Sequence, residues 1–172
     1  MDCMRTTLLI RNEIPEDIAR IREITELAFR DRAYSCKREH LIIDALRADR
    51  ALTVSLAALT GSTIVGHVAL SPVTISRASG SWYGLGPISV MPDFQRQGVG
   101  TAMMREALSH IAQRGASGCV LVGDPGYYIR FGFANDPSIV VEGVPSTFTL
   151  AHRFFPNSDH GVVNFHSAFA AA

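Results

Sequence analysis

Gln95-Arg96-Gln97-Gly98-Val99-Gly100 is the most informative segment of this chain. It lies between a strand-like run at residues 85–90 and a helical pattern at residues 101–113. Glycines let a backbone approach a ligand closely, and the first amides of a helix point outward at the positive end of its dipole. The stretch therefore predicts a strand-to-helix turn that binds phosphate.

The elements before this turn are predicted from the spacing of their apolar residues. Residues 7–10 are expected to form a first strand. Pro15 opens a helix whose isoleucines recur at helical spacing, and the pattern continues to Phe29. A second helix is expected over residues 38–47, before the main run of strands.

Three strands are predicted next, antiparallel to one another. Residues 51–59 and 63–75 form a hairpin, and the longer strand is expected to be broken or bent near Pro72. Residues 82–90 form the third strand. Its glycines and proline weaken a regular ladder and favour a bulge or a strand end that parts from its neighbour. These residues are Gly84, Gly86 and Pro87.

The elements after the turn alternate between helix and strand. The helix over residues 101–113 should stop at Gly115. Residues 118–122 form a buried strand, and Asp124 is expected to cap a short helix. Strand-like pieces of the tail fall at residues 138–141, 146–150 and 161–165.

This order predicts one domain over residues 1–172, of the mixed α/β (α+β) class, with a mostly antiparallel central sheet flanked by helices. At 47% hydrophobic residues the chain can bury a sizeable core. Sixteen basic residues balance sixteen acidic ones, so no nucleic acid or membrane is expected as a partner. Three cysteines without a metal-ligand spacing indicate no metal site and a cytoplasmic location.

Two common phosphate-binding motifs are missing from the sequence. There is no GxxxxGK[ST], which would indicate a P-loop nucleotidase, and no GxGxxG after a first strand, which would indicate a dinucleotide site. The Gln-x-x-Gly-x-Gly spacing of residues 95–100 points to a different phosphate ligand.

Two segments resemble a known family. Residues 85–100 match a strand ending in Val-x-Pro followed by (Gln/Arg)-x-x-Gly-x-(Gly/Ala), and Tyr128-Ile129-Arg130-Phe131-Gly132-Phe133 matches Tyr-x-x-x-Gly-Phe. On these motifs, and in element order over almost the whole chain, the sequence resembles the GCN5-related N-acetyltransferase (GNAT) superfamily. Residues 66–73 and 123–128 resemble its YhbS-like branch.

The resemblance implies acetyl-CoA as co-substrate. The backbone of the loop would wrap the pyrophosphate, and the pantetheine arm would pair with the splayed strand before the loop like an added strand. The residues expected to contact the cofactor are Ile88, Ser89, Val90, Gln95, Arg96, Gln97, Gly98, Val99, Gly100, Thr101, Tyr127 and Phe131.

Acyl transfer needs a proton donor for the leaving thiolate and a stabilised carbonyl oxygen. The resemblance places Tyr128 where relatives have a tyrosine near the CoA sulfur, and a phenol with its usual pKa of about 10 is protonated at neutral pH. Tyr128 is therefore the expected general acid, with Tyr127 as the alternative ring. The N–H of Val90 or its neighbour is expected to stabilise the oxyanion. No covalent intermediate is required.

The general base that takes the amine proton is less defined. Glu39, at the start of the second helix, is one candidate, because that region lines the acceptor pocket in the resembled family. Glu23, Glu26 and His67 are alternatives, as is a chain of water molecules. Both residues also have a purely structural interpretation. Glu39 would be a solvated acid favoured at the start of a helix, and His67 would be a hydrogen-bonded histidine inside the sheet.

Three functions are compatible with this sequence. The first is acetyl transfer from acetyl-CoA to a primary amine of a small molecule or protein. The second is a non-catalytic module that binds or senses acyl-CoA on the same fold. The third is an acyltransferase with a longer acyl donor or a macromolecular acceptor. Exposed strand edges in the tail are also available to pair with a second copy of the chain in a homodimer.

Overall fold

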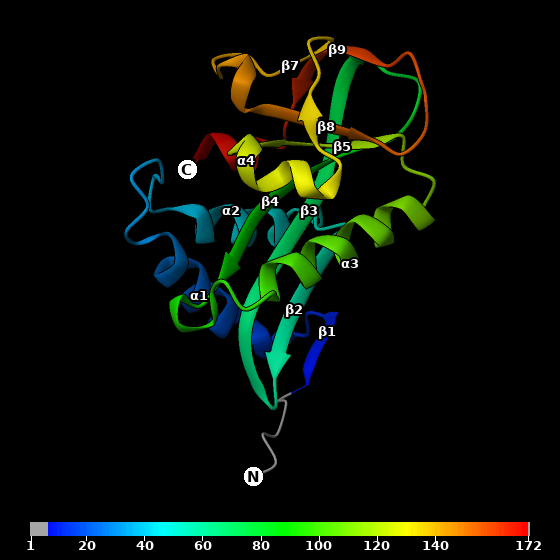
Figure 1. Cartoon of the computed structure of the whole chain (residues 1–172). Coiled ribbons are helices and arrows are strands. Elements are labelled where there is room, and N and C mark those ends of the chain that lie inside the picture. Colours follow the sequence, from blue (N-terminus) through cyan, green and yellow to red (C-terminus); the bar gives the residue numbers. More distant parts are fainter. Residues whose placement is uncertain (1–6, 172) are drawn as a thin grey trace.

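Three consecutive antiparallel strands form the centre of the sheet (Figure 1). They are seen in a computed structural model that describes residues 7–171, so that Cys3 lies outside the described part. β2 (Val54–Thr60) turns into β3 (Thr63–Arg77), and β4 (Trp82–Val90) returns beside β3. β1 (Leu8–Asn12) pairs with β2 at one edge. The predicted antiparallel run is confirmed.

β3 runs through Pro72 without a break, so of the two predicted alternatives, a broken or a bent strand, the break is wrong. The irregularity lies earlier, where the register with β4 slips between Val68 and Leu70. On its other edge β3 pairs with β2 as far as Leu70 and with β9 (His160–Asn164) from Thr74 onward. Pro72 falls between these two partners, where a missing N–H on that edge removes no ladder bond.

β4 and β5 (Gly118–Val122) are parallel and pair only over their first residues. Beyond this short contact, residues 85–90 of β4 pair with β3 alone. The two strands therefore diverge toward their carboxyl ends and leave a gap in the sheet, as the glycines and proline of β4 predicted. The three facing pairs are Trp82 with Gly118, Tyr83 with Cys119, and Gly84 with Val120.

The tail completes the sheet. β8 (Thr149–Arg153) pairs with β5, and the short β6 (Ala134–Asn135) pairs with β8. β9 joins the far half of β3 to β7 (Ile139–Val140). Buried Asp159 holds this region to the start of β4, because it accepts the indole N–H of Trp82 at 2.8 Å.

Helices cover both faces of the sheet (Figure 1). α1 (Ile18–Phe29) and α2 (Glu39–Ala48) lie on one face, and α3 (Val99–Gln113) and the short α4 (Pro125–Tyr128) lie on the other. Within residues 7–171, no helix has the length and apolar character needed to cross a membrane.

The alternation of side chains along β2 separates the two layers. Leu56 and Ala58 belong to the large core beneath α3, whereas Ala57 and Leu59 pack under Ile24 of α1. Successive strand residues point to opposite faces, so one apolar strand serves both helical layers. The end of the sheet where β4 and β5 diverge is thereby held between two packed layers.

Candidate active site

The phosphate loop links β4 to α3. The helix begins at Val99, two residues before the predicted start at Thr101. Gly98 precedes it with a φ of 88°, a left-handed conformation that glycine adopts without strain. Because Gly98 turns the chain straight into the helix, Val99 and Gly100 already lie in its first turn.

The backbone N–H groups of residues 96–101 donate no hydrogen bond within the described part of the chain. The first bond at this end of α3 comes from the N–H of Ala102, which donates to the carbonyl of Gly98 at 3.0 Å. A run of free amides at the positive end of a 15-residue helix is suited to an anion. The loop thus presents the free amides that the predicted phosphate site requires.

Two glutamine side chains support this loop from within. Gln95 donates from Nε2 to the carbonyl of Val90 at 3.0 Å, and Gln97 donates from Nε2 to the carbonyl of Asp93 at 2.8 Å. Arg32, in the segment after α1, donates to Oε1 of Gln95 at 3.4 Å. The side chains at motif positions 95 and 97 therefore brace the loop, and its backbone is left for the ligand.

The register of β4 decides which backbone groups face the gap. The N–H of Met91 donates to the carbonyl of Val65 at 2.8 Å, so Gly66 and Val90 face each other as a pair without mutual hydrogen bonds. The N–H and C=O of Val90 consequently point away from β3, into the gap. By the same alternation, those of Ile88 do so too.

Ser89 lies on the same strand but is directed elsewhere. It faces His67 of β3 in the hydrogen-bonded register, so its backbone groups serve the ladder. Its hydroxyl lies 3.2 Å from Oγ1 of Thr25 on α1. Of the three expected cofactor contacts on this strand, Ile88 and Val90 present backbone groups to the gap and Ser89 does not.

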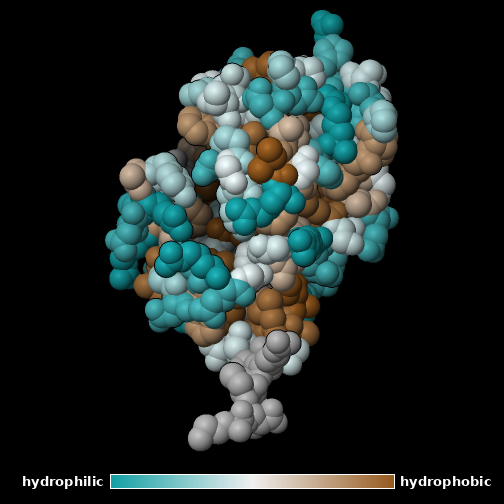
Figure 2. All heavy atoms as spheres, in the orientation of Figure 1, coloured by the Kyte–Doolittle hydropathy of each residue, from teal (hydrophilic) through white to brown (hydrophobic). Residues whose placement is uncertain are grey.

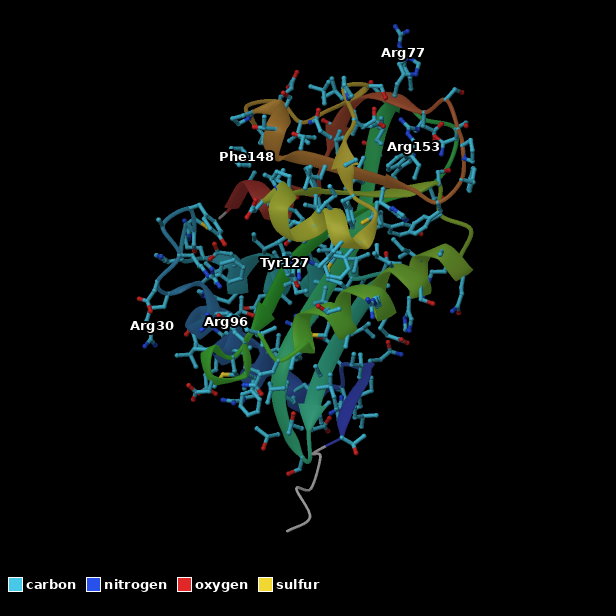
Figure 3. The ribbon with its side chains drawn as sticks, viewed as in Figure 1. Arg30, Arg77, Arg96, Tyr127, Phe148 and Arg153 are labelled. Atoms are coloured by element: carbon cyan, nitrogen blue, oxygen red, sulfur yellow. The ribbon has the colours of Figure 1, made fainter. Side chains whose placement is uncertain are left out.

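Tyr127 lies against the start of α3. A β-carbon at Gly100 would sit 2.9 Å from its hydroxyl oxygen, so only glycine fits there without displacing the ring. Burial raises the pKa of Tyr127, although Arg130 and a hydrogen bond with Thr101 oppose the rise. Figure 3 shows the ring between α4 and α3, with Arg96 on the loop beyond it. Tyr127 thus supports the first turn of the helix.

Tyr128 is positioned over the end of β5. A β-carbon at Gly123 would lie 2.5 Å from Cε2 of its ring, so glycine is required where the ring packs. Asp124 caps α4 as predicted, accepting the N–H of Gly126 at 2.9 Å. Burial raises the pKa of Tyr128 well above its usual value. Its hydroxyl makes no hydrogen bond with residues 7–171, so it is a free, protonated donor at neutral pH.

Glu39 occupies the first turn of α2 on the helix face that carries buried Ile42, Ile43 and Leu46. Its Oε2 is buried and has no hydrogen-bond partner among the described residues. An unpaired carboxylate oxygen in such a place is costly unless a ligand or water completes it. Glu39 is therefore not the solvated helix-start acid that was the alternative interpretation of the sequence.

Ion pairs between α1 and α2 show where Glu39 lies along the sheet. Arg22 pairs with Asp44 at 2.5 Å and Glu26 with His40 at 3.4 Å, which makes the helices antiparallel. Because α1 passes Ser89 at Thr25, the start of α2 lies level with the carboxyl end of β4. Glu39 and the free N–H of Val90 are thus at the same end of the gap.

His67 is held inside the fold and away from the gap. Its Nε2 lies 2.8 Å from Oγ of Ser55, which donates to Glu13 at 2.5 Å. Arg47 donates to the same carboxylate at 2.8 and 3.1 Å. Burial lowers the pKa of His67, so the ring is neutral at pH 7. No sequence motif signalled this four-residue network, because its members come from four separate segments.

Phe131 lies in the main core at 9% exposure, with its ring 5.4 Å from that of Tyr127. Its ring packs against that of Tyr127 from the side of the core. The other base candidates, Glu23 and Glu26, are exposed and pair with Arg20 and with Arg22 on their own helix. No group of three side chains suited to a metal ion occurs among residues 7–171.

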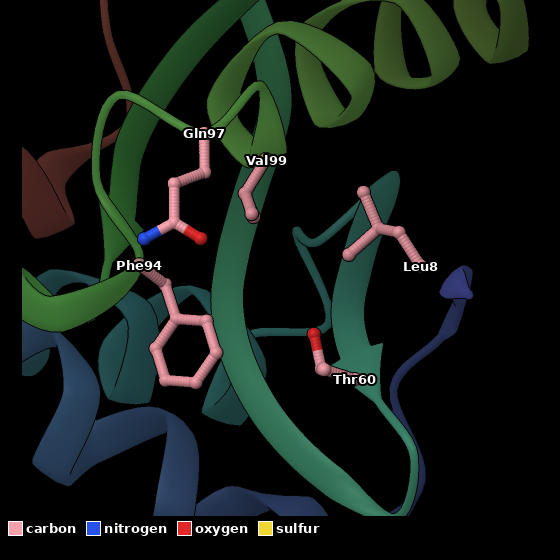
Figure 4. Close-up of a pocket in the computed structure, with 5 residues that line it drawn as sticks. All are labelled: Leu8, Thr60, Phe94, Gln97 and Val99. Atoms are coloured by element: carbon pink, nitrogen blue, oxygen red, sulfur yellow. The ribbon is translucent and has the colours of Figure 1, made fainter. Parts of the chain in front are cut away.

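Two open pockets flank the loop. One of about 290 Å³ lies on its outer side, where Phe94 and Gln97 face Thr60 and Leu8 of the β1–β2 edge (Figure 4). The other, of about 320 Å³, lies between the end of α1 and Gln95. Figure 2 shows a recess with an apolar floor between the α1–α2 side and the part that carries α4. The loop is thus accessible from both sides.

A family comparison agrees with this geometry. Residues 18–133 match the model of the acetyltransferase (GNAT) family. The chain therefore belongs to this family, and the mixed sheet with its splayed strand is the GNAT fold. The resemblance predicted from the sequence is confirmed.

Particular relatives define the similarity further. The chain is 31% identical over 170 residues to "Uncharacterized N-acetyltransferase YhbS" of Escherichia coli K12, covering 94% of this chain and 98% of that protein. A GNAT acetyltransferase from Brucella melitensis, solved in complex with acetyl-CoA, is 45% identical with a TM-score of 0.84, covering 96% and 99%. E. coli YhbS, solved in complex with CoA, is 28% identical with a TM-score of 0.87, covering 99% and 96%.

Proposed function

We propose that this protein transfers an acetyl group from acetyl-CoA to a primary amine by direct attack, without a covalent enzyme intermediate. The observation that carries the proposal is the edge of β4 at Ile88 and Val90, which β5 leaves unpaired just before the free amides of the loop. Relatives solved with acetyl-CoA or CoA support the choice of co-substrate.

Binding would use the backbone throughout. The amides of residues 96–101 would bind the pyrophosphate, with Arg96 free to approach it because its side chain is exposed. Ile88 would pair with the amides of the pantetheine arm, as an added strand pairs with a sheet edge, and the N–H of Val90 would face the acyl end of the cofactor. This arrangement would extend the acyl end along the gap toward Tyr128.

We assign one group of the protein to each chemical step. Glu39 would take the proton of the amine, directly or through one water, as its nitrogen bonds to the acyl carbon. The N–H of Val90 would donate to the carbonyl oxygen as negative charge develops there. As the carbon–sulfur bond breaks, Tyr128 would give its proton to the sulfur. The raised pKa of Tyr128 ensures that this proton is present at neutral and mildly alkaline pH.

The test is release of thiol from acetyl-CoA across an amine panel, with CoA binding measured separately by calorimetry. We expect turnover with at least one amine, and roughly a hundredfold loss of kcat in Glu39→Gln with little change in CoA affinity. Glu23→Gln, an exposed acid of α1, is the matched control and should keep the wild-type rate.

Two results would contradict the proposal. Tight CoA binding with no turnover on any amine would identify a sensing module in place of an enzyme. Equal rates for Glu39→Gln and Glu23→Gln would remove Glu39 as the base.

A further inference from the structure

The gap between β4 and β5 has an apolar wall on the side of β5. Val122, the last residue of this strand, is 48% exposed, and Phe148, just before β8, is 47% exposed. The N–H of Gly123 donates to the carbonyl of Phe148 at 3.0 Å, which fixes the two segments side by side. Large apolar side chains exposed together mark a contact surface better than scattered ones.

A third member comes from the segment between α1 and α2. Tyr34 is 80% exposed, and it lies near enough to Tyr128 to contribute to the raised pKa of that residue. Tyr128 itself packs on Gly123, next to Val122. Tyr34, Val122 and Phe148 are therefore exposed near the carboxyl end of β5, at the mouth of the gap where Tyr128 packs on Gly123.

One side of the rim around this mouth carries an excess of positive charge. The segment of residues 30–38 carries four cationic side chains and one acidic one, and all five are exposed. Figure 3 shows Arg30 pointing outward from this segment. Lys37 donates to the carbonyls of Phe29 and Arg32 at 3.1 and 2.6 Å, which holds its charge at the rim. Such a rim repels a molecule with several positive charges.

We infer that the acceptor is a monoamine carried on an apolar, aromatic-sized body, whose ring packs against Tyr34, Val122 and Phe148 while its nitrogen reaches Glu39. This inference rests on the proposed function and names its substrate class. The apolar wall favours a ring, and the basic rim disfavours polycations such as polyamines and aminoglycosides. The apolar wall and the basic rim are independent features of the same opening, and both favour an apolar monoamine as the acceptor.

The test compares kcat/KM for phenethylamine and tryptamine with that for spermidine and kanamycin. We expect the aromatic monoamines to be preferred at least tenfold. Phe148→Ala and Tyr34→Ala should each raise KM for phenethylamine roughly tenfold and leave acetyl-CoA binding unchanged. Phe155→Ala is the matched control, because Phe155 is 48% exposed and lies beyond the opposite end of β8.

The outcomes separate this inference from the proposed function. Preference for spermidine, or an unchanged KM in both wall variants, would overturn the acceptor class and leave acetyl transfer standing. If no amine reacts, the proposed acetyl transfer is wrong. The acceptor class is then tested on its own by measuring the binding of phenethylamine to the CoA-loaded protein by calorimetry. Binding that weakens in Phe148→Ala but not in Phe155→Ala supports it, and no binding overturns it.

Discussion

The positions of Tyr128 and Glu39 are fixed by side chains that pack next to them in the fold. Tyr128 needs the missing side chain of Gly123 beneath its ring. Glu39 is held on the buried face of α2 by the isoleucines and leucine that follow it. Glu39 keeps a buried carboxylate oxygen without a partner among the described residues, which is costly in a fold with no ligand to receive it.

A substitution at the single residue Tyr128 tests its role as the proton donor. Tyr128→Phe should lower kcat by roughly ten- to a hundredfold, since the ring remains and only the donor is lost. CoA affinity, measured by calorimetry, should change less than about threefold. Tyr83→Phe, a ring of β4 that packs on the main core, should behave as wild type. An unchanged rate in Tyr128→Phe would exclude it as the acid.

At the scale of elements, the loop and α3 act as one unit. Gly98 turns the chain, Gly100 makes room for Tyr127, and Gln95 ties the loop to the last residue of β4. The strand edge and the helix start are therefore held in one fixed relation. The sequence indicated a phosphate turn here, but the helix start and the bracing by Gln95 became visible only in the fold.

A charge at Gly98 tests this unit. Gly98→Glu places a carboxylate among the free amides and should weaken acetyl-CoA binding at least a hundredfold, measured by calorimetry. Gly61→Glu is a close control, because Gly61 also has a positive φ, of 61°, and open space around it, in the β2–β3 turn. Both variants carry the same backbone strain. Equal CoA affinities in the two would remove this loop as the pyrophosphate site.

At the scale of the whole molecule, the buried network of Glu13, Arg47, Ser55 and His67 joins the segment after β1 to α2, β2 and β3. Burial disfavours the charge of Glu13, but hydrogen bonds from His67, Arg47 and Ser55 outweigh it and hold the pKa of Glu13 well below its usual range. The network fixes α2, and with it Glu39, against the sheet.

Glu13→Gln should lower stability at pH 7 by about 2–3 kcal/mol, or roughly 5–10 °C in Tm. Because the folded pKa of Glu13 lies below its unfolded value of about 4.3, its contribution is complete above that pH and is lost as the pH falls further. The Tm difference from wild type should therefore shrink below about pH 4.

Thermal unfolding at a series of pH values checks this prediction. Glu16→Gln, an exposed acid of the turn before α1, is the control and should shift Tm by less than about 2 °C. A Tm difference for Glu13→Gln that stays constant from pH 7 to pH 3 would show that the carboxylate is not stabilised in the folded state.

The family and most of the helices and strands could be predicted from the sequence, because they depend on local features: helical periodicity, a proline or glycine at a helix end, and a short motif. The sequence placed β4 and β5 correctly and predicted Asp124 as a cap. A homodimer and a cytoplasmic location remain predictions from the sequence.

The tertiary structure alone decided which groups face the gap. Strand register directs the backbone of Ile88 and Val90 toward it and that of Ser89 toward β3. Partner exchange along β3 explains why Pro72 does not break the strand. These outcomes depend on contacts between residues far apart in the chain, whose pairing is set by packing of the whole sheet and cannot be derived from local pattern.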